Sequence, residues 1–72
     1  MASYVVLIEQ GPTSIGASCP DLPGVIAVAD TEPEVMRLMS EALQLHIAGL
    51  REDGLPIPAP SIVAAEIQVD AA

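Results

Sequence analysis

The sequence predicts an α+β fold in which one helix packs on a four-stranded mixed sheet, with the element order β-β-β-α-β. Three observations lead to this prediction. Three short apolar runs precede residue 30, a long stretch with helical periodicity follows them, and a further β-branched run closes the chain. A chain of 72 residues has room for one core, so residues 1–72 are expected to form a single domain.

The first two strands are predicted to form a hairpin. Tyr4–Gln10 is almost continuously apolar, which is typical of a strand covered on both faces in the middle of a sheet. Gly11 and Pro12 break this run, and Ser14–Cys19 then alternates small polar residues with apolar ones, as a half-exposed strand does. We therefore place the first strand centrally and the second beside it.

Residues 20–24, with the sequence PDLPG, predict a sharp turn before a third strand. Pro23 supplies the fixed φ for the first central position of a type II turn, and Gly24 supplies the positive φ of the second. The following run, Val25–Ala29, is again rich in β-branched residues and is predicted to be the third strand.

A long amphipathic helix is predicted over about Glu32–Asp53. Thr31 can cap the amide of Glu34 while the Glu34 carboxylate reaches back to Thr31, and Pro33 occupies the first turn, where its missing N–H costs nothing. Gly54 is expected to end the helix as its left-handed cap residue.

The apolar arc of this helix is wider than one sheet face needs. The excess lies on the side of Met36, Leu43 and Ile47, and two interpretations stay open: edge packing within the same domain, which we prefer, or a dimer surface. His46 falls near the centre of the arc, so we interpret it as a packing histidine rather than a catalytic base.

The remainder of the chain is predicted to be an extended connector and a fourth strand. Residues 55–61 alternate prolines with other residues, which holds a chain extended. Ile62–Val69 is rich in β-branched residues, and a right-handed crossover through the helix would lay it parallel to one of the earlier strands.

The charge balance indicates a protein partner rather than a nucleic acid. The formal net charge is -8, and the only basic residues are Arg37 and Arg51. Phosphates would be repelled by such a chain, whereas a basic protein surface would be attracted, although the acidity is equally consistent with keeping a small hydrophobic domain soluble. With one cysteine, no leader-like N-terminus and no long apolar run, the chain is expected to be cytoplasmic and without a membrane segment.

No residue pattern indicates chemistry, so we expect no enzyme activity, no catalytic or metal-binding residues and no cofactor. Cys19 has no basic neighbour to lower its pKa. Glu32 and Glu34 are explained by capping and by the helix dipole, and the glycines lie singly rather than in a phosphate-binding loop.

Four motifs follow one another in a fixed order between residues 20 and 61: PDLPG, a DT helix start, a Glu-Ala pair in the helix and DGLPIPAPS. The signature residues are Pro20, Asp21, Leu22, Pro23, Gly24, Asp30, Thr31, Glu41, Ala42, Gly54, Ile57, Pro58 and Pro60. In this order and spacing the set resembles the N-terminal domain of HicB-type antitoxins.

The resemblance implies a fold similar to a truncated ribonuclease H, with a three-stranded meander, one helix across its face and a fourth strand parallel to the first. It also implies a partner, because the family domain binds and blocks HicA, a small basic toxin that cleaves messenger RNA. An acidic inhibitor is suited to a basic RNA-binding enzyme, since it can occupy the surface that would hold phosphates.

The resemblance does not carry every family property to this chain. Family antitoxins usually continue into a DNA-binding domain, and this sequence ends at Ala72, so we expect no operator binding. An alternative hypothesis is an orphan domain that self-associates without a toxin. A divalent-metal nuclease is the weakest hypothesis, because the first strand offers only Glu9 as a ligand. A homodimer or higher oligomer is expected, through a strand edge or the exposed side of the helix.

Overall fold

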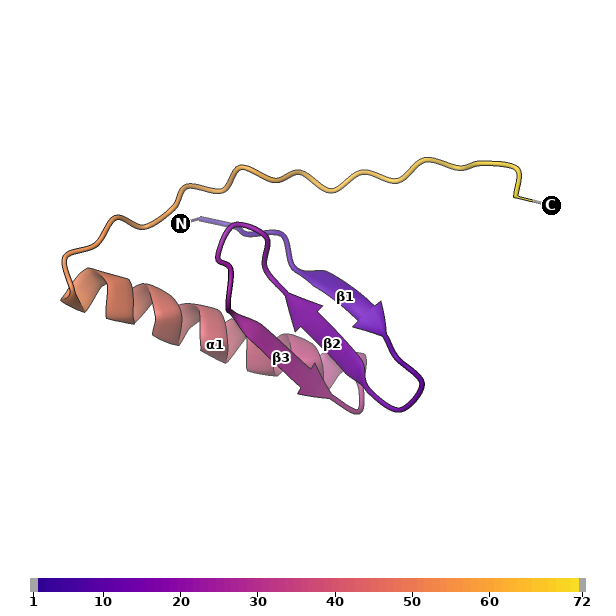
Figure 1. The fold of residues 1–72 in the computed structure, drawn as a ribbon, viewed down its shortest axis with the longest axis horizontal. Coiled ribbons are helices and arrows are strands. Elements are labelled where there is room, and N and C mark those ends of the chain that lie inside the picture. The colour runs from indigo at the N-terminus through magenta and orange to yellow at the C-terminus, as the bar shows by residue number, and fades with distance from the viewer. Residues whose placement is uncertain (1, 72) are drawn as a thin grey trace.

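The fold is α+β, as predicted, but its sheet has three strands. The computed structural model describes residues 2–71. Its elements are β1 (Leu7–Gln10), β2 (Ile15–Ser18), β3 (Ile26–Ala29) and α1 (Glu32–Glu52). The strands are antiparallel in the order β1-β2-β3, and α1 packs across one face of the sheet (Figure 1).

The position of the first strand differs from the prediction. β1 lies at an edge rather than in the centre, because it pairs with β2 alone. It is also shorter than predicted: residues 4–6 precede the strand and are assigned to none. The central strand is β2, in which Ile15 pairs with Gln10 on one side and with Ala29 on the other.

The turn between β2 and β3 has the predicted geometry. The Val25 N–H donates to the Leu22 carbonyl at 3.2 Å, and Gly24 has a φ of 92°. This is the left-handed region that the second central position of a type II turn requires. The turn also carries Leu22 into the core, where its side chain is 2% exposed.

Both ends of α1 are capped by the residues that the sequence indicated. At the start, the Thr31 hydroxyl accepts a hydrogen bond from the Glu34 N–H at 3.3 Å. The return hydrogen bond predicted from the Thr31 N–H to the Glu34 carboxylate is not formed among residues 2–71. At the end, Gly54 adopts a φ of 67° while the Leu55 N–H donates to the Leu50 carbonyl at 2.9 Å. This pattern is a Schellman motif, which satisfies carbonyls that the last helical turn leaves free.

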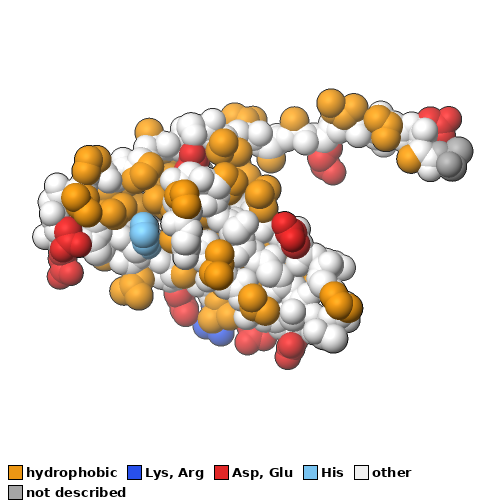
Figure 2. Space-filling view, in the orientation of Figure 1, with side chains coloured by type: hydrophobic (Ala, Val, Ile, Leu, Met, Phe, Trp, Pro, Cys, Tyr) orange, Lys and Arg blue, Asp and Glu red, His pale blue; other side chains and the backbone are white. Residues whose placement is uncertain are grey.

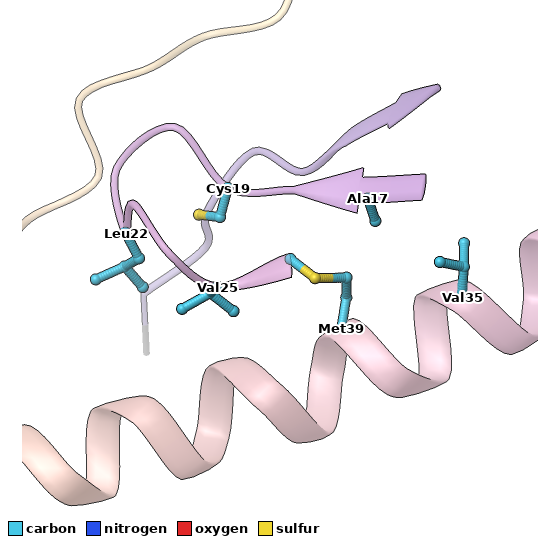
Figure 3. Close-up of a cluster of buried hydrophobic side chains, with 6 residues drawn as sticks. All are labelled: Ala17, Cys19, Leu22, Val25, Val35 and Met39. Carbon is cyan, nitrogen blue, oxygen red and sulfur yellow. The ribbon is translucent and has the colours of Figure 1, made fainter. Parts of the chain in front are cut away.

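The core is small and lies between α1 and the inner face of the sheet. Figure 3 shows Val35 and Met39 projecting from the helix toward side chains of β2, of the 20–24 turn and of the residue that precedes β3. The buried residues are Ala17, Cys19, Leu22, Val25, Val35 and Met39. These six side chains are aliphatic or sulfur-containing, and none is aromatic, so the core is a thin layer between α1 and the sheet.

The prediction that His46 packs inside the domain is wrong, because the residue is exposed. The reason is a mismatch of lengths. The 21 residues of α1 extend over about 31 Å, whereas a strand of four residues covers only about 13 Å. The second half of the helix therefore extends beyond the sheet, and the neighbouring Leu45 is also exposed, at 76%.

The predicted fourth strand is not present. Residues 55–71 form an extended C-terminal arm that belongs to no helix or strand and is exposed throughout (Figure 1). The proline-rich connector is extended as predicted, but Ile62–Val69 acquires no backbone partner, which a strand requires. The radius of gyration is 14.3 Å, against about 11 Å for a compact chain of this length, so the arm lengthens the molecule.

Candidate interaction surfaces

The C-terminal arm is held to the domain at two points near its start. The carboxylate of Asp21 accepts hydrogen bonds from the Ser61 N–H, at 3.0 Å, and from the Ser61 hydroxyl. The Tyr4 hydroxyl donates to the Pro58 carbonyl. These contacts link the 20–24 turn and the N-terminal segment to the connector, and they fix the place where the arm leaves the body.

The hydrogen bonds between Ser61 and Asp21 also affect the ionisation of the Asp21 carboxyl. The Ser61 hydroxyl and then the Ser61 backbone N–H lower the pKa of the Asp21 carboxyl, because both donate to its ionised form. The tether is therefore strongest when Asp21 is charged.

Beyond Ser61 the arm presents an apolar side to solvent. Val63, Ile67 and Val69 are 89%, 86% and 77% exposed. They share one side of an extended chain, because side chains alternate with period two, while Glu66 and Gln68 lie on the other side. Figure 2 shows hydrophobic side chains along the part of the arm that stands clear of the body.

The outer face of the sheet, opposite α1, is a second uncovered apolar surface. Leu7, Ile26 and Val28 are 48%, 67% and 62% exposed. The strand register places Leu7 and Ile26 on either side of Ser18, so two branched side chains flank a small one. The result is a shallow hollow of about 260 Å³, and Glu9 also lines it.

A groove of about 470 Å³ lies beside the overhanging half of α1. It is lined by Leu43, Ile47 and Arg51 from the helix together with Tyr4 and Ile57. Leu43 and Ile47 are half-buried and pack against the core, as the preferred interpretation of the wide apolar arc expected, whereas Met36 is 44% exposed. The alternative, that these three residues form a dimer surface, stays a prediction.

The sequence of this chain matches a model of a known protein family over nearly the whole length of the chain. The family model described as the HicB-like antitoxin of bacterial toxin–antitoxin systems matches residues 4–71. The chain belongs to this family.

One curated relative of this HicB-like chain is an uncharacterised 14.9 kDa protein from the rep-hol intergenic region of Haemophilus phage HP1. The two are 36% identical over 55 residues, which cover 76% of this chain and 41% of the phage protein. The chain thus spans less than half the length of that relative. No solved structure matches it.

Several signature residues of the HicB-like chain have clear structural roles. Asp21 holds the connector, Gly24 and Gly54 take the positive φ angles of the two turns, and Pro58 accepts the Tyr4 hydrogen bond. Ala42 is half-buried against the core. These positions build the scaffold and direct the arm.

The charged side chains of the HicB-like chain are dispersed. Arg37 forms a surface ion pair with Glu41, at 3.1 Å, in an i,i+4 arrangement on α1. Among residues 2–71, no three or more of the His, Cys, Asp and Glu side chains come together in a group that could hold a metal ion. Within that same range, no helix has the length and apolar character needed to cross a membrane.

Sequence reasoning missed both the tether and the outer sheet face. The tether joins residues forty positions apart, and the only local signal was an acid in the 20–24 turn that no helix start explained. The outer face had a clearer signal, because Ile26 and Val28 alternate with Ala27 and Ala29. Small residues at alternate positions allow the helix to approach closely, which leaves the large ones on the opposite face.

Proposed function

We propose that this HicB-like chain binds and neutralises a small basic toxin of the HicA type, with the outer face of its sheet as the contact surface. The observation that carries the proposal is the uncovered apolar hollow of Leu7, Ile26 and Val28 with Glu9 in its lining. Exposed apolar surface bordered by polar groups is typical of a protein interaction site. The family membership supports the antitoxin role.

Charge supports a basic partner. The chain carries a net charge of -8, and one of its two basic residues is already paired with Glu41. Such a surface attracts a basic protein and accelerates its association, and it repels nucleic acid. The antitoxin acts by occupying the toxin surface that otherwise holds the RNA backbone, without catalysis and without binding nucleic acid itself, and it does so in the cytoplasm.

The test is inhibition of RNA cleavage by a purified HicA-type toxin encoded next to this chain. The proposal expects cleavage to fall in proportion to added chain and to stop near equimolar amounts. Cleavage that continues at a tenfold excess of the chain contradicts it.

Paired variants locate the surface. Ile26→Asp places a charge on the outer face, whereas Leu45→Asp adds the same charge at a similarly exposed position on the helix overhang. We expect at least a tenfold weaker toxin Kd for Ile26→Asp, as for a contact residue at the centre of an interface, and less than a twofold change for Leu45→Asp. A circular dichroism spectrum of Ile26→Asp that matches the wild-type spectrum shows that loss of binding does not reflect loss of the fold. Equal effects of the two aspartate variants would place the interface elsewhere.

Self-association without a toxin is the second candidate function. The specific observation in its favour is the exposed arm, whose apolar side chains lie outside the core.

A further inference from the structure

We propose that two copies of this chain exchange their C-terminal arms, so that residues 62–69 of each copy add as a strand to the open edge of β1 in the other. This association does not depend on the toxin proposed above. It is inferred from a donor segment and an acceptor edge of the same chain, both of which lack a strand partner among residues 2–71.

The donor is the arm beyond Ser61. Its Val63, Ile67 and Val69 are all more than three-quarters exposed, although the segment has the alternation of a half-buried strand. Its backbone N–H and C=O groups belong to no sheet. Such a segment is stabilised when it is paired along its backbone and covered on its apolar side.

The acceptor is the outer edge of β1 together with the residues that precede it. β1 pairs on one side only, and Tyr4–Val6 are half-buried and apolar but precede the assigned strand. A strand added at this edge can pair along residues 4–10, a length close to that of the eight-residue donor. The other open edge, on β3, has only the four residues Ile26–Ala29 between two turns, so it is a shorter match.

The donor segment of the arm starts from a fixed position at Ser61. It is therefore not a loose tail, which favours a specific exchange between two copies. Ser61 is bound to Asp21, and the connector to Tyr4, so the segment leaves the body at a defined point. From there it extends past the body instead of folding onto it (Figure 2). The longest extent of the molecule is 51 Å, against 26 Å and 18 Å for the others, so the arm can reach a neighbouring molecule.

Stoichiometry favours a second copy as the occupant. Each chain has one donor segment and one acceptor edge of matching length, so exchange across a two-fold axis pairs both in both copies and leaves no free arm. A different protein that received the arm would leave the β1 edge open. Charge repulsion is also low at this contact. The only charged residue among residues 62–69 is Glu66, and the only one among residues 4–10 is Glu9.

The surface area buried between the two copies is sufficient for a specific dimer only if both arms are exchanged. Stable interfaces bury roughly 30–40 Å² per participating residue, as about 800 Å² on each partner is spread over about 20–30 residues. With the eight arm residues and the seven edge residues of each copy, reciprocal exchange buries about 1,000 Å² in total, near the lower limit for a specific association. One arm docked alone gives about half of that.

The first experiment is sedimentation equilibrium of the full chain and of two arm variants with the same added charge. Ile67→Asp alters the apolar side of the arm, and Gln68→Asp alters the opposite side. We expect a dimer whose Kd rises at least tenfold in Ile67→Asp and less than threefold in Gln68→Asp. A wild-type chain that stays monomeric at millimolar concentration overturns the proposal, and so does a dimer that both variants leave intact.

The second experiment identifies the exchanged strand directly. An isotope-filtered NOESY spectrum of a dimer made from one ¹³C,¹⁵N-labelled and one unlabelled chain reports only contacts between chains. We expect such contacts between residues 62–69 of one chain and residues 4–10 of the other. Contacts within one chain only, or arm contacts that form only after a toxin is added, contradict the exchange.

Discussion

The replacement of Met39 by alanine tests the thin core between α1 and the sheet. Met39 is 1% exposed and lies with Val35 opposite the side chains of the sheet (Figure 3). Truncation of a buried methionine to alanine costs about 2–5 kcal/mol, because apolar contacts are lost and a cavity remains. A domain of this size is expected to have an unfolding free energy of only about 4–11 kcal/mol, so one substitution removes a large share of it.

The measurement is urea unfolding followed by circular dichroism at 222 nm, at one protein concentration because self-association shifts apparent stability. Leu45→Ala is the matched control, since it truncates a side chain on the same helix that is 76% exposed. We expect a loss of about 3 kcal/mol for Met39→Ala and a change within about 0.5 kcal/mol for Leu45→Ala. If Met39→Ala changes stability no more than its control, the core is not where the structure places it.

Two further predictions concern Asp21 and the glycines of α1 and its C-terminal cap. Because Ser61 lowers the Asp21 pKa below its ordinary value of 3.8, the tether contributes fully above that pH and is lost as the pH falls through the lowered value. Hydrogen exchange of the Ser61 amide should accelerate relative to neighbouring amides in acid, and Asp21→Asn should remove this pH dependence; an unchanged profile in the variant argues against the tether. Gly49→Ala should stabilise α1 by about 0.5–1 kcal/mol, since a Cβ there meets nothing within 4 Å, whereas Gly54→Ala should destabilise it by about 1 kcal/mol because of its φ of 67°. Thermal unfolding of the two variants decides this pair, and a shift of the same sign in both contradicts it.

Local signals in the sequence predicted the local structure well. The type II turn at Gly24, the Thr31 cap and the end of α1 at Gly54 all depend on residues within a few positions of one another. Propensity and hydrogen-bonding capacity determine such features directly, so one sequence is enough to predict them.

The features that depend on contacts between distant segments lay beyond the reach of these local signals. The run Tyr4–Gln10 indicated a central strand, but its position depends on whether Ile62–Val69 pairs with it, and within one chain that pairing does not form. His46 is exposed because the helix is longer than the sheet beneath it, and no pattern within the helix itself carries that information. The tether between Asp21 and Ser61 likewise joins two turns that periodicity cannot relate.

The apolar outer face of the sheet explains why an otherwise small and acidic domain is suited to bind protein. Its branched side chains are held in register by β1, β2 and β3 and stay uncovered because α1 packs on the opposite face. The arm adds beside β1, whereas Ile26 and Val28 of the outer face lie on β3. A dimer formed by arm exchange therefore leaves this part of the outer face free to contact a toxin.

Methyl NMR of the labelled chain, titrated with a catalytically inactive HicA-type toxin, tests the central claim most directly. We predict that the methyl signals of Leu7, Ile26 and Val28 shift and broaden in proportion to added toxin, while the signals of Leu45 stay unchanged. Shifts confined to the helix overhang, or no shift at a twofold excess of toxin, would contradict it.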